Sequence, residues 1–186
     1  DEYEKNLPTI VKKCEEKIVC PQPSLNQAVY VGAQTCKSCH QEAYNVWKNA
    51  KFIVEAKDEN NNLIKREIGH SKAWQTLVDA KSDNDRSCIG CHSIGFMQPG
   101  GYCKSTEVDF RKDVQCESCH GPGSLHAKSA KKQDIIGKVD EQTCRSCHHV
   151  PHIKSFDSFN YQRDVVKVLG KGHGEKLLQQ LTHKKP

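Results

Sequence analysis

The sequence predicts a mostly α-helical fold, made of short helices and loops wrapped around material other than side chains. Hydrophobic residues make up only 35% of the 186 residues and aromatic residues 6%, and the mean hydropathy is −0.75. A chain this polar cannot bury enough apolar side-chain surface to offset the entropy it loses on folding. The same chain contains eleven cysteines and ten histidines, which indicate what that material is.

The composition also argues against nucleic acid as a partner and against a membrane-spanning helix. The formal net charge is +5, from 28 basic and 23 acidic residues, which is too mild to indicate nucleic-acid binding. No apolar run approaches the length of about 20 residues that a membrane-spanning helix needs. We therefore expect no nucleic-acid partner and no membrane span.

Eight of the eleven cysteines fall in four copies of Cys-x-x-Cys-His, the attachment pattern of c-type haem. Two thiols three residues apart on a helical turn reach the two vinyl groups of a haem, and the adjacent histidine then meets the iron. Zinc sites also use Cys-x-x-Cys pairs, but they need no histidine directly after the second cysteine. We therefore predict four covalently bound haems, attached at Cys36 and Cys39, Cys88 and Cys91, Cys116 and Cys119, and Cys144 and Cys147, with His40, His92, His120 and His148 as proximal ligands.

Haem attachment also predicts the compartment, because cytochrome c maturation takes place outside the cytoplasmic membrane. We expect an exported protein, periplasmic or extracellular at the cell surface, whose signal peptide has been removed. In an oxidising compartment Cys14 and Cys20, six residues apart, are expected to form a local disulfide. Cys103 is then the odd cysteine, although pairings through Cys103 stay open.

The chain divides into a haem-free segment, residues 1–30, and a tetrahaem domain, residues 31–186. Its prolines predict an extended or looped path for residues 1–30. Thr35 is a good N-cap for a helix that runs to about Ala50 and carries the first motif. Residues 57–67 are polar and predict a turn or a hairpin insertion.

Four further elements follow along the tetrahaem domain. The apolar spacing predicts a second helix over residues 70–80. Residues 95–105 are rich in glycine and predict a loop, and Gly121-Pro122-Gly123 ends the helical turn of the third motif. A last long element is expected over residues 161–181.

Six histidines outside the motifs are candidates for the sixth iron ligands. His70 and His173 each lie in line with apolar residues on one helical face, and His126 follows the Gly-Pro-Gly turn by three residues. These three are the preferred candidates. The others are His149, His152 and His183, while Met97 is too close to His92 to reach the opposite face of that haem. Three good candidates for four irons leave one iron in question.

The order of these motifs resembles the cytochrome c-554 family of tetrahaem cytochromes. The resemblance rests on Trp47 after the first motif, the stretch from Gly69 to Ala73, the sequence Cys-Ile-Gly-Cys-His-Ser-Ile-Gly-Phe from Cys88, the Gly-Gly-Tyr at 100–102 and the Cys-Glu-Ser-Cys-His-Gly-Pro-Gly from Cys116. It implies a mostly helical fold around four stacked haems. By position it implies that His126 ligates the first haem, His173 the third and His70 the fourth.

The resemblance implies a five-coordinate second haem, that of His92. Here the spare His149, His152 and His183, or a neighbouring subunit, are alternatives that would close this site. The insertion between Trp47 and His70 and the segment 1–30 have no evident counterpart in the family.

These observations predict electron transfer by closely spaced, mainly bis-histidine haems, with redox proteins or extracellular electron acceptors as partners and no enzyme activity. One alternative is the subunit of an extracellular, conductive cytochrome filament with haem ligation between subunits. Four ferric haems with ionised propionates would add about −4 to the formal charge, and a near-neutral surface favours such a homopolymer. The other alternative is reduction of a small nitrogen oxide at an open second haem.

Overall fold

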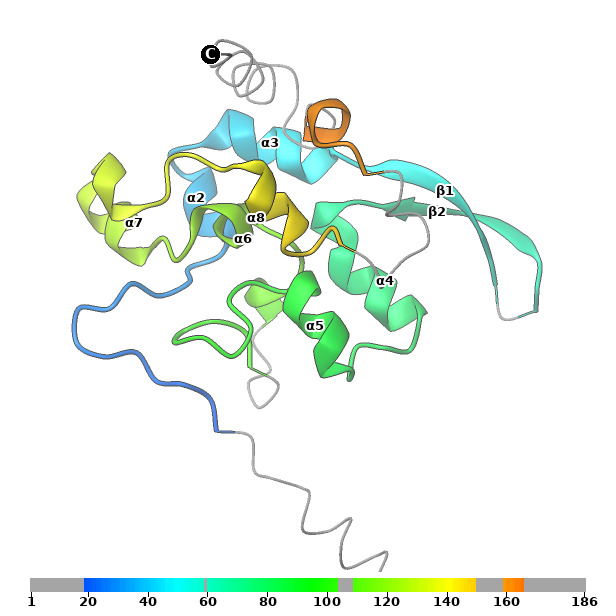
Figure 1. Cartoon of the computed structure of the whole chain (residues 1–186), viewed down its shortest axis with the longest axis horizontal. Coiled ribbons are helices and arrows are strands. Elements are labelled where there is room, and N and C mark those ends of the chain that lie inside the picture. The colour runs from blue at the N-terminus through cyan, green and yellow to red at the C-terminus, as the bar shows by residue number, and fades with distance from the viewer. Residues whose placement is uncertain (1–18, 59, 104–108, 150–158, 166–186) are drawn as a thin grey trace, which may run out of the picture.

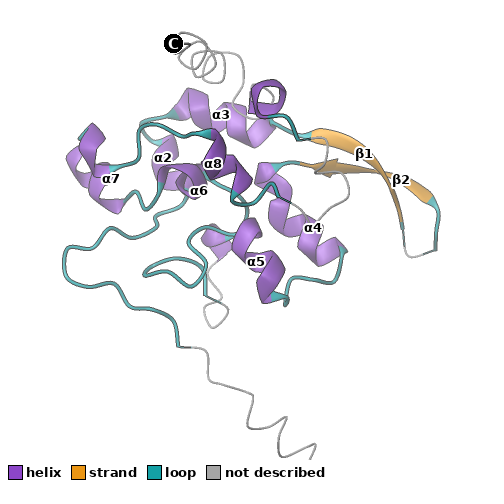
Figure 2. Cartoon of the chain, viewed as in Figure 1, coloured by secondary structure: helices purple, strands orange, loops and turns teal. Residues whose placement is uncertain are grey.

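The structure is a computed structural model that describes residues 19–58, 60–103, 109–149 and 159–165. Short helices and loops make up most of this part of the chain, and a two-stranded ribbon is the one sheet within it (Figures 1 and 2). The elements are α2 (Ala33–Lys37), α3 (Gln41–Asn49), β1 (Phe52–Lys57), β2 (Leu63–Ile68), the 3-10 turn η1 (His70–Lys72), α4 (Ala73–Asp79), α5 (Arg86–His92), the 3-10 turn η2 (Asp109–Arg111), α6 (Cys116–His120), α7 (Ser124–Ser129), the 3-10 turn η3 (Lys132–Asp134) and α8 (Glu141–Arg145). The predicted mostly helical class is confirmed. None of the described helices is long and apolar enough to cross a membrane.

The single helix predicted from Thr35 to Ala50 is wrong, because the chain forms two helices there. α2 begins after Gly32, and Thr35 lies inside it with its hydroxyl donating to the carbonyl of Val31 at 3.0 Å. His40 has φ −120° and ψ 48°, which is outside the helical region, and α3 starts only at the next residue. The histidine of the motif is therefore the point at which the chain changes direction.

The predicted insertion is an antiparallel hairpin, and its strands extend beyond the predicted residues 57–67. β1 and β2 pair in register from Phe52 opposite Ile68 to Lys57 opposite Leu63. In the turn, the carboxylate of Asp58 accepts hydrogen bonds from the amides of two of the following asparagines, which fixes the reversal. The ribbon projects from the helical body (Figure 1).

The predicted helix over residues 70–80 is present as η1 followed by α4. Its apolar face buries Trp74 and Leu77 against Ile89 of α5 and Tyr102, and the rings of Trp74 and Tyr102 lie 5.0 Å apart. Within the described residues this cluster holds four buried side chains.

The glycine-based predictions hold where the structure describes them. The segment from Gly95 to Cys103 is an irregular loop, closed by a hydrogen bond from the amide of Tyr102 to the carbonyl of Ile94 at 2.9 Å. Gly121, with φ 73°, ends α6. The last predicted element is helical over residues 161–165, and its remainder lies outside the described residues.

The segment before α2 is fastened to the rest of the chain. Cys20 forms a disulfide with Cys103, with the two Cα atoms 5.8 Å apart, so the expected pairing of Cys20 with Cys14 is wrong. The reason lies in the path of the chain: Tyr30 packs on Gly95 and Val29 packs on Gly100 of the glycine loop, and Cys103 lies at the end of that loop. Cys14 lies outside the described residues. The domain boundary at residue 30 stays a prediction.

Candidate haem-binding site

Each Cys-x-x-Cys-His motif is built on one turn of helix. The motifs lie at α2, α5, α6 and α8 and the residues that follow them. In the first and fourth motifs the amide of the histidine closes the turn on the carbonyl of the first cysteine, at 3.0 Å for His40 and 2.9 Å for His148. A helical turn places residues i and i+3 on one face, so both thiols of a motif point to the same side.

The motif cysteines take no part in disulfides, in contrast to Cys20 and Cys103. Cysteines of different motifs lie next to each other. The sulfur of Cys36 lies beside that of Cys116. The sulfur of Cys91 lies beside that of Cys147. The first motif therefore adjoins the third, and the second adjoins the fourth.

Two histidine pairs face each other across the motifs. The ring centroids of His40 and His126 lie 6.1 Å apart with the planes 22° apart. Those of His70 and His148 lie 6.0 Å apart with the planes tilted by 50°. Two imidazoles that share one metal through bonds of about 2 Å would have centroids about 6 Å apart. The gap between the rings therefore fits an iron, and the ligand assignments themselves stay predictions.

Backbone carbonyls orient three of the candidate ligands. The Nδ1 atom of His92 lies 2.5 Å from the carbonyl oxygen of Ala73, that of His120 lies 2.7 Å from Ile136 O, and that of His126 lies 2.9 Å from Lys131 O. A carbonyl can only accept, so in each case Nδ1 carries the proton and Nε2 is left to bind a metal. Sequence reasoning missed these carbonyls, because only the fold brings a backbone group to a distant ring.

The two members of the second ring pair, His70 and His148, are half-buried. Burial lowers the pKa of His70 to about 4, with smaller contributions from His148 and His92, so its imidazole is neutral at physiological pH. The neutral form is the one that ligates a metal. Phe159 stacks on His148 with ring centroids 4.6 Å apart, and burial lowers the pKa of His148 as well.

The structure does not place every candidate. His149 lies next to the fourth motif, with its Nδ1 3.1 Å from the carbonyl oxygen of Arg145. His152, His173 and His183 lie outside the described residues. Within the described part of the chain, His92 faces no second histidine ring of the kind that His40 and His148 face.

A buried carboxylate joins the first and third motifs. Glu117, between the two cysteines of the third motif, is 2% exposed. Its oxygens accept hydrogen bonds from the amides of Val31 at 3.0 Å, Gly32 at 2.7 Å and Gly123 at 2.7 Å. Gly32 is the residue from which α2 begins, so Glu117 fixes the start of the first motif's helix. The middle positions of Cys-x-x-Cys-His carry no haem chemistry, and the sequence therefore gave no sign of this role.

Comparison with known proteins finds similarity in the part of the chain that carries the motifs. The family described as cytochrome c554 and c-prime matches residues 35–121. Cytochrome c-554 of Nitrosomonas europaea is 30% identical over 139 residues, an alignment that spans 65% of this chain. Over these residues the chain resembles the cytochrome c554 family.

A solved structure has a similar fold. The reduced state of cytochrome c554 from Nitrosomonas europaea matches with a TM-score of 0.50 and 26% identity, over 76% of this chain and 84% of that one. This chain spans 58% of the length of the curated relative. These similarities agree with the predicted cofactors, four covalently bound c-type haems.

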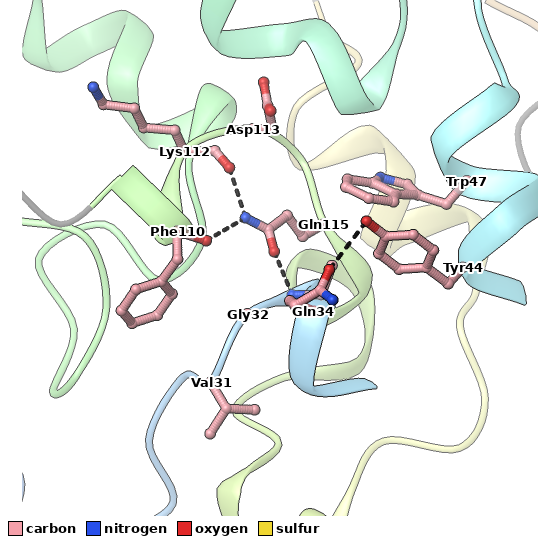
Figure 3. Close-up of a pocket in the computed structure, with 10 residues that line it drawn as sticks. Val31, Gly32, Gln34, Tyr44, Trp47, Phe110, Lys112, Asp113 and Gln115 are labelled. Carbon is pink, nitrogen blue, oxygen red and sulfur yellow. Dashed lines mark hydrogen bonds between the residues drawn. The ribbon is translucent and has the colours of Figure 1, made fainter. Parts of the chain in front are cut away.

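One cavity lies beside the first motif (Figure 3). It measures about 210 Å³ and is lined by Val31, Gly32, Ala33, Gln34, Tyr44, Trp47, Phe110, Lys112, Asp113 and Gln115. Gln115 spans its floor, donating to the carbonyls of Phe110 and Lys112 at 2.6 Å each and accepting from the amide of Ala33. Trp47 donates through Nε1 to the carbonyl of Val114 at 2.7 Å. The aromatic face of α3 is thus anchored on the loop segment that leads into the third motif.

Proposed function

We propose that this chain is an electron-transfer protein that moves single electrons between redox partners through its four haems. The contacts between motifs carry the proposal. Since Cys36 touches Cys116 and Cys91 touches Cys147, the attachment points of different haems adjoin one another. Attachment points this close favour exchange of electrons between neighbouring cofactors inside the protein.

The haems supply iron that cycles between the ferric and ferrous states by one electron. The chain would hold each iron through a motif histidine, and His70 is half-buried beside the fourth motif. Ligation by two histidines gives lower reduction potentials than ligation by histidine and methionine. We therefore propose low to intermediate potentials, with His40 and His126 on the first haem and His70 and His148 on the fourth.

A stepwise reduction of the purified holoprotein tests this function. Haem content is measured first as the pyridine haemochrome, and four haems per chain are expected. A redox titration then yields four one-electron steps, and the reduced protein re-oxidises fully when it is mixed with a second c-type cytochrome of higher potential. Fewer than four haems, or haems that exchange no electrons with such a partner, would contradict the proposal.

A second candidate function rests on His92. No second histidine ring faces it within the described residues, whereas His40 and His148 each have one. An iron with a vacant position binds small nitrogen oxides and can reduce them. The EPR spectrum of the oxidised protein tests this candidate: a high-spin ferric signal from one haem in four supports it. Four low-spin signals would mean that His149, His152, His183 or a neighbouring subunit supplies the ligand, and would rule it out.

We propose that the protein works outside the cytoplasmic membrane, since covalent haem attachment takes place there.

The purified holoprotein also tests the filament alternative. The filament alternative rests on the sequence alone, on segment 1–30 and the spare histidines. Sedimentation at micromolar concentration distinguishes the two assemblies: a single species near 21 kDa plus haem supports a free carrier, and long polymers support the filament.

A further inference from the structure

Asp113 lies where the segments of two different haem sites meet. It is half-buried and lies between η2 and the third motif, with a left-handed backbone at φ 77°. Its amide donates to the carbonyl of His92 at 2.9 Å, and the next amide, that of Val114, donates to the carbonyl of His70 at 3.1 Å. Two consecutive peptide groups therefore hold the backbone of two candidate iron ligands.

The side chain of Asp113 reaches a different element. Its Oδ1 accepts a hydrogen bond of 2.8 Å from the amide of Trp74, the second residue of α4. Lys72, at the N-cap position of α4, provides no capping side-chain bond. Because the first amides of a helix have no partner within the helix, a carboxylate from elsewhere in the chain takes the place of the cap. Asp113 thus fixes the first turn of α4.

The first turn of α4 in turn holds the ring of His92. The carbonyl of Ala73, the residue before Trp74, lies 2.5 Å from Nδ1 of His92. Thr76 donates to the same carbonyl at 2.6 Å, which restrains it further. His92 is therefore held at two points that both depend on Asp113. One is its own carbonyl, and the other is its imidazole, through α4.

We propose that Asp113 is a positioning residue that sets the orientation and basicity of the His92 imidazole, and through it the reduction potential of the second haem. The inference rests on the proposed function, because it takes His92 as an iron ligand. A carbonyl that accepts from Nδ1 makes the other ring nitrogen a better donor to the metal, and this stabilises the ferric state. Loss of the Asp113 carboxylate loosens the turn that carries this carbonyl, so the potential of the second haem rises.

Two substitutions distinguish the role of the Asp113 carboxylate from that of the Asp113 backbone. Asp113→Gly removes the carboxylate and tolerates the left-handed backbone, whereas Asp113→Asn keeps an oxygen acceptor and also tolerates that backbone. Asp58→Ala is the matched control, because Asp58 likewise accepts backbone amide bonds but does so in the turn of the hairpin. All three are made in the full holoprotein.

The readout is the redox titration together with the EPR spectrum. In Asp113→Gly we expect one of the four potentials to rise and the other three to stay unchanged, with altered g-values for the same haem. Asp113→Asn shifts the same haem in the same direction by less, since an amide oxygen is a weaker acceptor than a carboxylate. Asp58→Ala leaves all four potentials unchanged. The shifted haem is identified from His92→Met, which changes the spectrum of the His92 haem directly.

Three outcomes would overturn the inference. They are unchanged potentials in both Asp113 variants, an equal shift of all four haems, and a shift of a haem other than that of His92. If Asp113→Gly fails to fold with its haems attached, Asp113→Asn still tests the inference. Failure of the proposed function is recognised separately, because it shows in the unmodified protein as fewer than four haems or as no electron exchange.

Discussion

His126 faces His40 across 6.1 Å between ring centroids, with the two planes 22° apart. The two rings come from different elements, one from α7 and one from the turn between α2 and α3. The carbonyl of Lys131 fixes the Nδ1 proton of His126, so the nitrogen available for a metal is Nε2. The fold thus brings to the first motif the histidine that sequence resemblance implied for it.

Replacement of His126 tests this arrangement. In His126→Ala the first iron loses one axial ligand, and we expect a high-spin ferric EPR signal equal to one haem in four beyond any signal of the parent protein. In His126→Met the potential of one haem rises, because a thioether ligand favours the ferrous state. Lys128→Ala, on the same helix, is the control and leaves the spectrum unchanged. A low-spin spectrum identical to that of the parent in His126→Ala would show that His126 is not a ligand.

The disulfide leads to a prediction about thiol chemistry. If the eight motif cysteines bind haem as proposed and Cys20 pairs with Cys103, Cys14 is the remaining cysteine of the eleven. We expect one thiol per chain to react with a thiol reagent in the unfolded holoprotein, and none in Cys14→Ser. A bond between Cys14 and Cys20 would leave Cys103 as the reactive thiol instead, and Cys14→Ser would then contain two reactive thiols, those of Cys20 and Cys103.

The same disulfide should contribute to stability. It closes a loop between residues 83 positions apart, which the loop-entropy model values at about 4.5 kcal/mol at most. The double variant Cys20→Ser with Cys103→Ser should therefore unfold at a clearly lower urea concentration than the parent, as followed by near-UV circular dichroism. Cys14→Ser is the control. Equal midpoints for all three proteins would mean that the segment before α2 is held by its other contacts.

The sequence predicted the cofactor chemistry of this protein better than the course of its backbone. Cys-x-x-Cys-His identified the cofactor because the attachment reaction itself requires that spacing. The break at His40 was missed, since the preference of Thr35 for N-caps is local and the turn at the motif overrides it. The partner of Cys20 was missed for a related reason. Nearness in sequence favoured Cys14, whereas the packing of Tyr30 on the glycine loop decides the pairing.

The supporting groups of the site were beyond sequence reasoning altogether. Ala73, Ile136 and Lys131 act through backbone carbonyls, and any residue type offers a carbonyl. Glu117 and Asp113 act through carboxylates, but acidic residues are common on polar surfaces and only burial and hydrogen bonds distinguish these two. Positions of this kind become visible only when the fold is known.

Of these positions, Glu117 is expected to lose the most stability on substitution. Its carboxylate accepts hydrogen bonds from three backbone amides and is 2% exposed. Glu117→Gln turns one acceptor oxygen into a donor that faces amide groups, which should cost about 3 kcal/mol of unfolding free energy. Glu67→Gln is the control: Glu67 pairs with Lys51 at 3.2 Å but its side chain is 51% exposed, so about 0.5 kcal/mol or less is expected. Urea unfolding of the holoproteins measures both, and equal effects would contradict the role assigned to Glu117.

Gly95 is the position at which the buried Tyr30 meets the loop after the second motif. Gly95 has φ +59°, and a Cβ atom added there would overlap the Tyr30 ring. Gly95→Ala therefore combines a left-handed alanine with a displaced aromatic ring, and we expect a loss of about 3 kcal/mol. Gly137→Ala is the control, because a Cβ there meets no atom within 4 Å.

A double-mutant cycle isolates the contact between these two residues. In Tyr30→Ala the ring is absent, so adding Gly95→Ala costs only the backbone strain of about 1 to 2 kcal/mol. The double variant should thus be more stable than the sum of the single effects predicts. If the two effects on the unfolding free energy simply add, the ring of Tyr30 is not in close contact with residue 95. The segment before α2 is then held in place by the Cys20 disulfide and by the hydrogen bonds from backbone amides to Glu117.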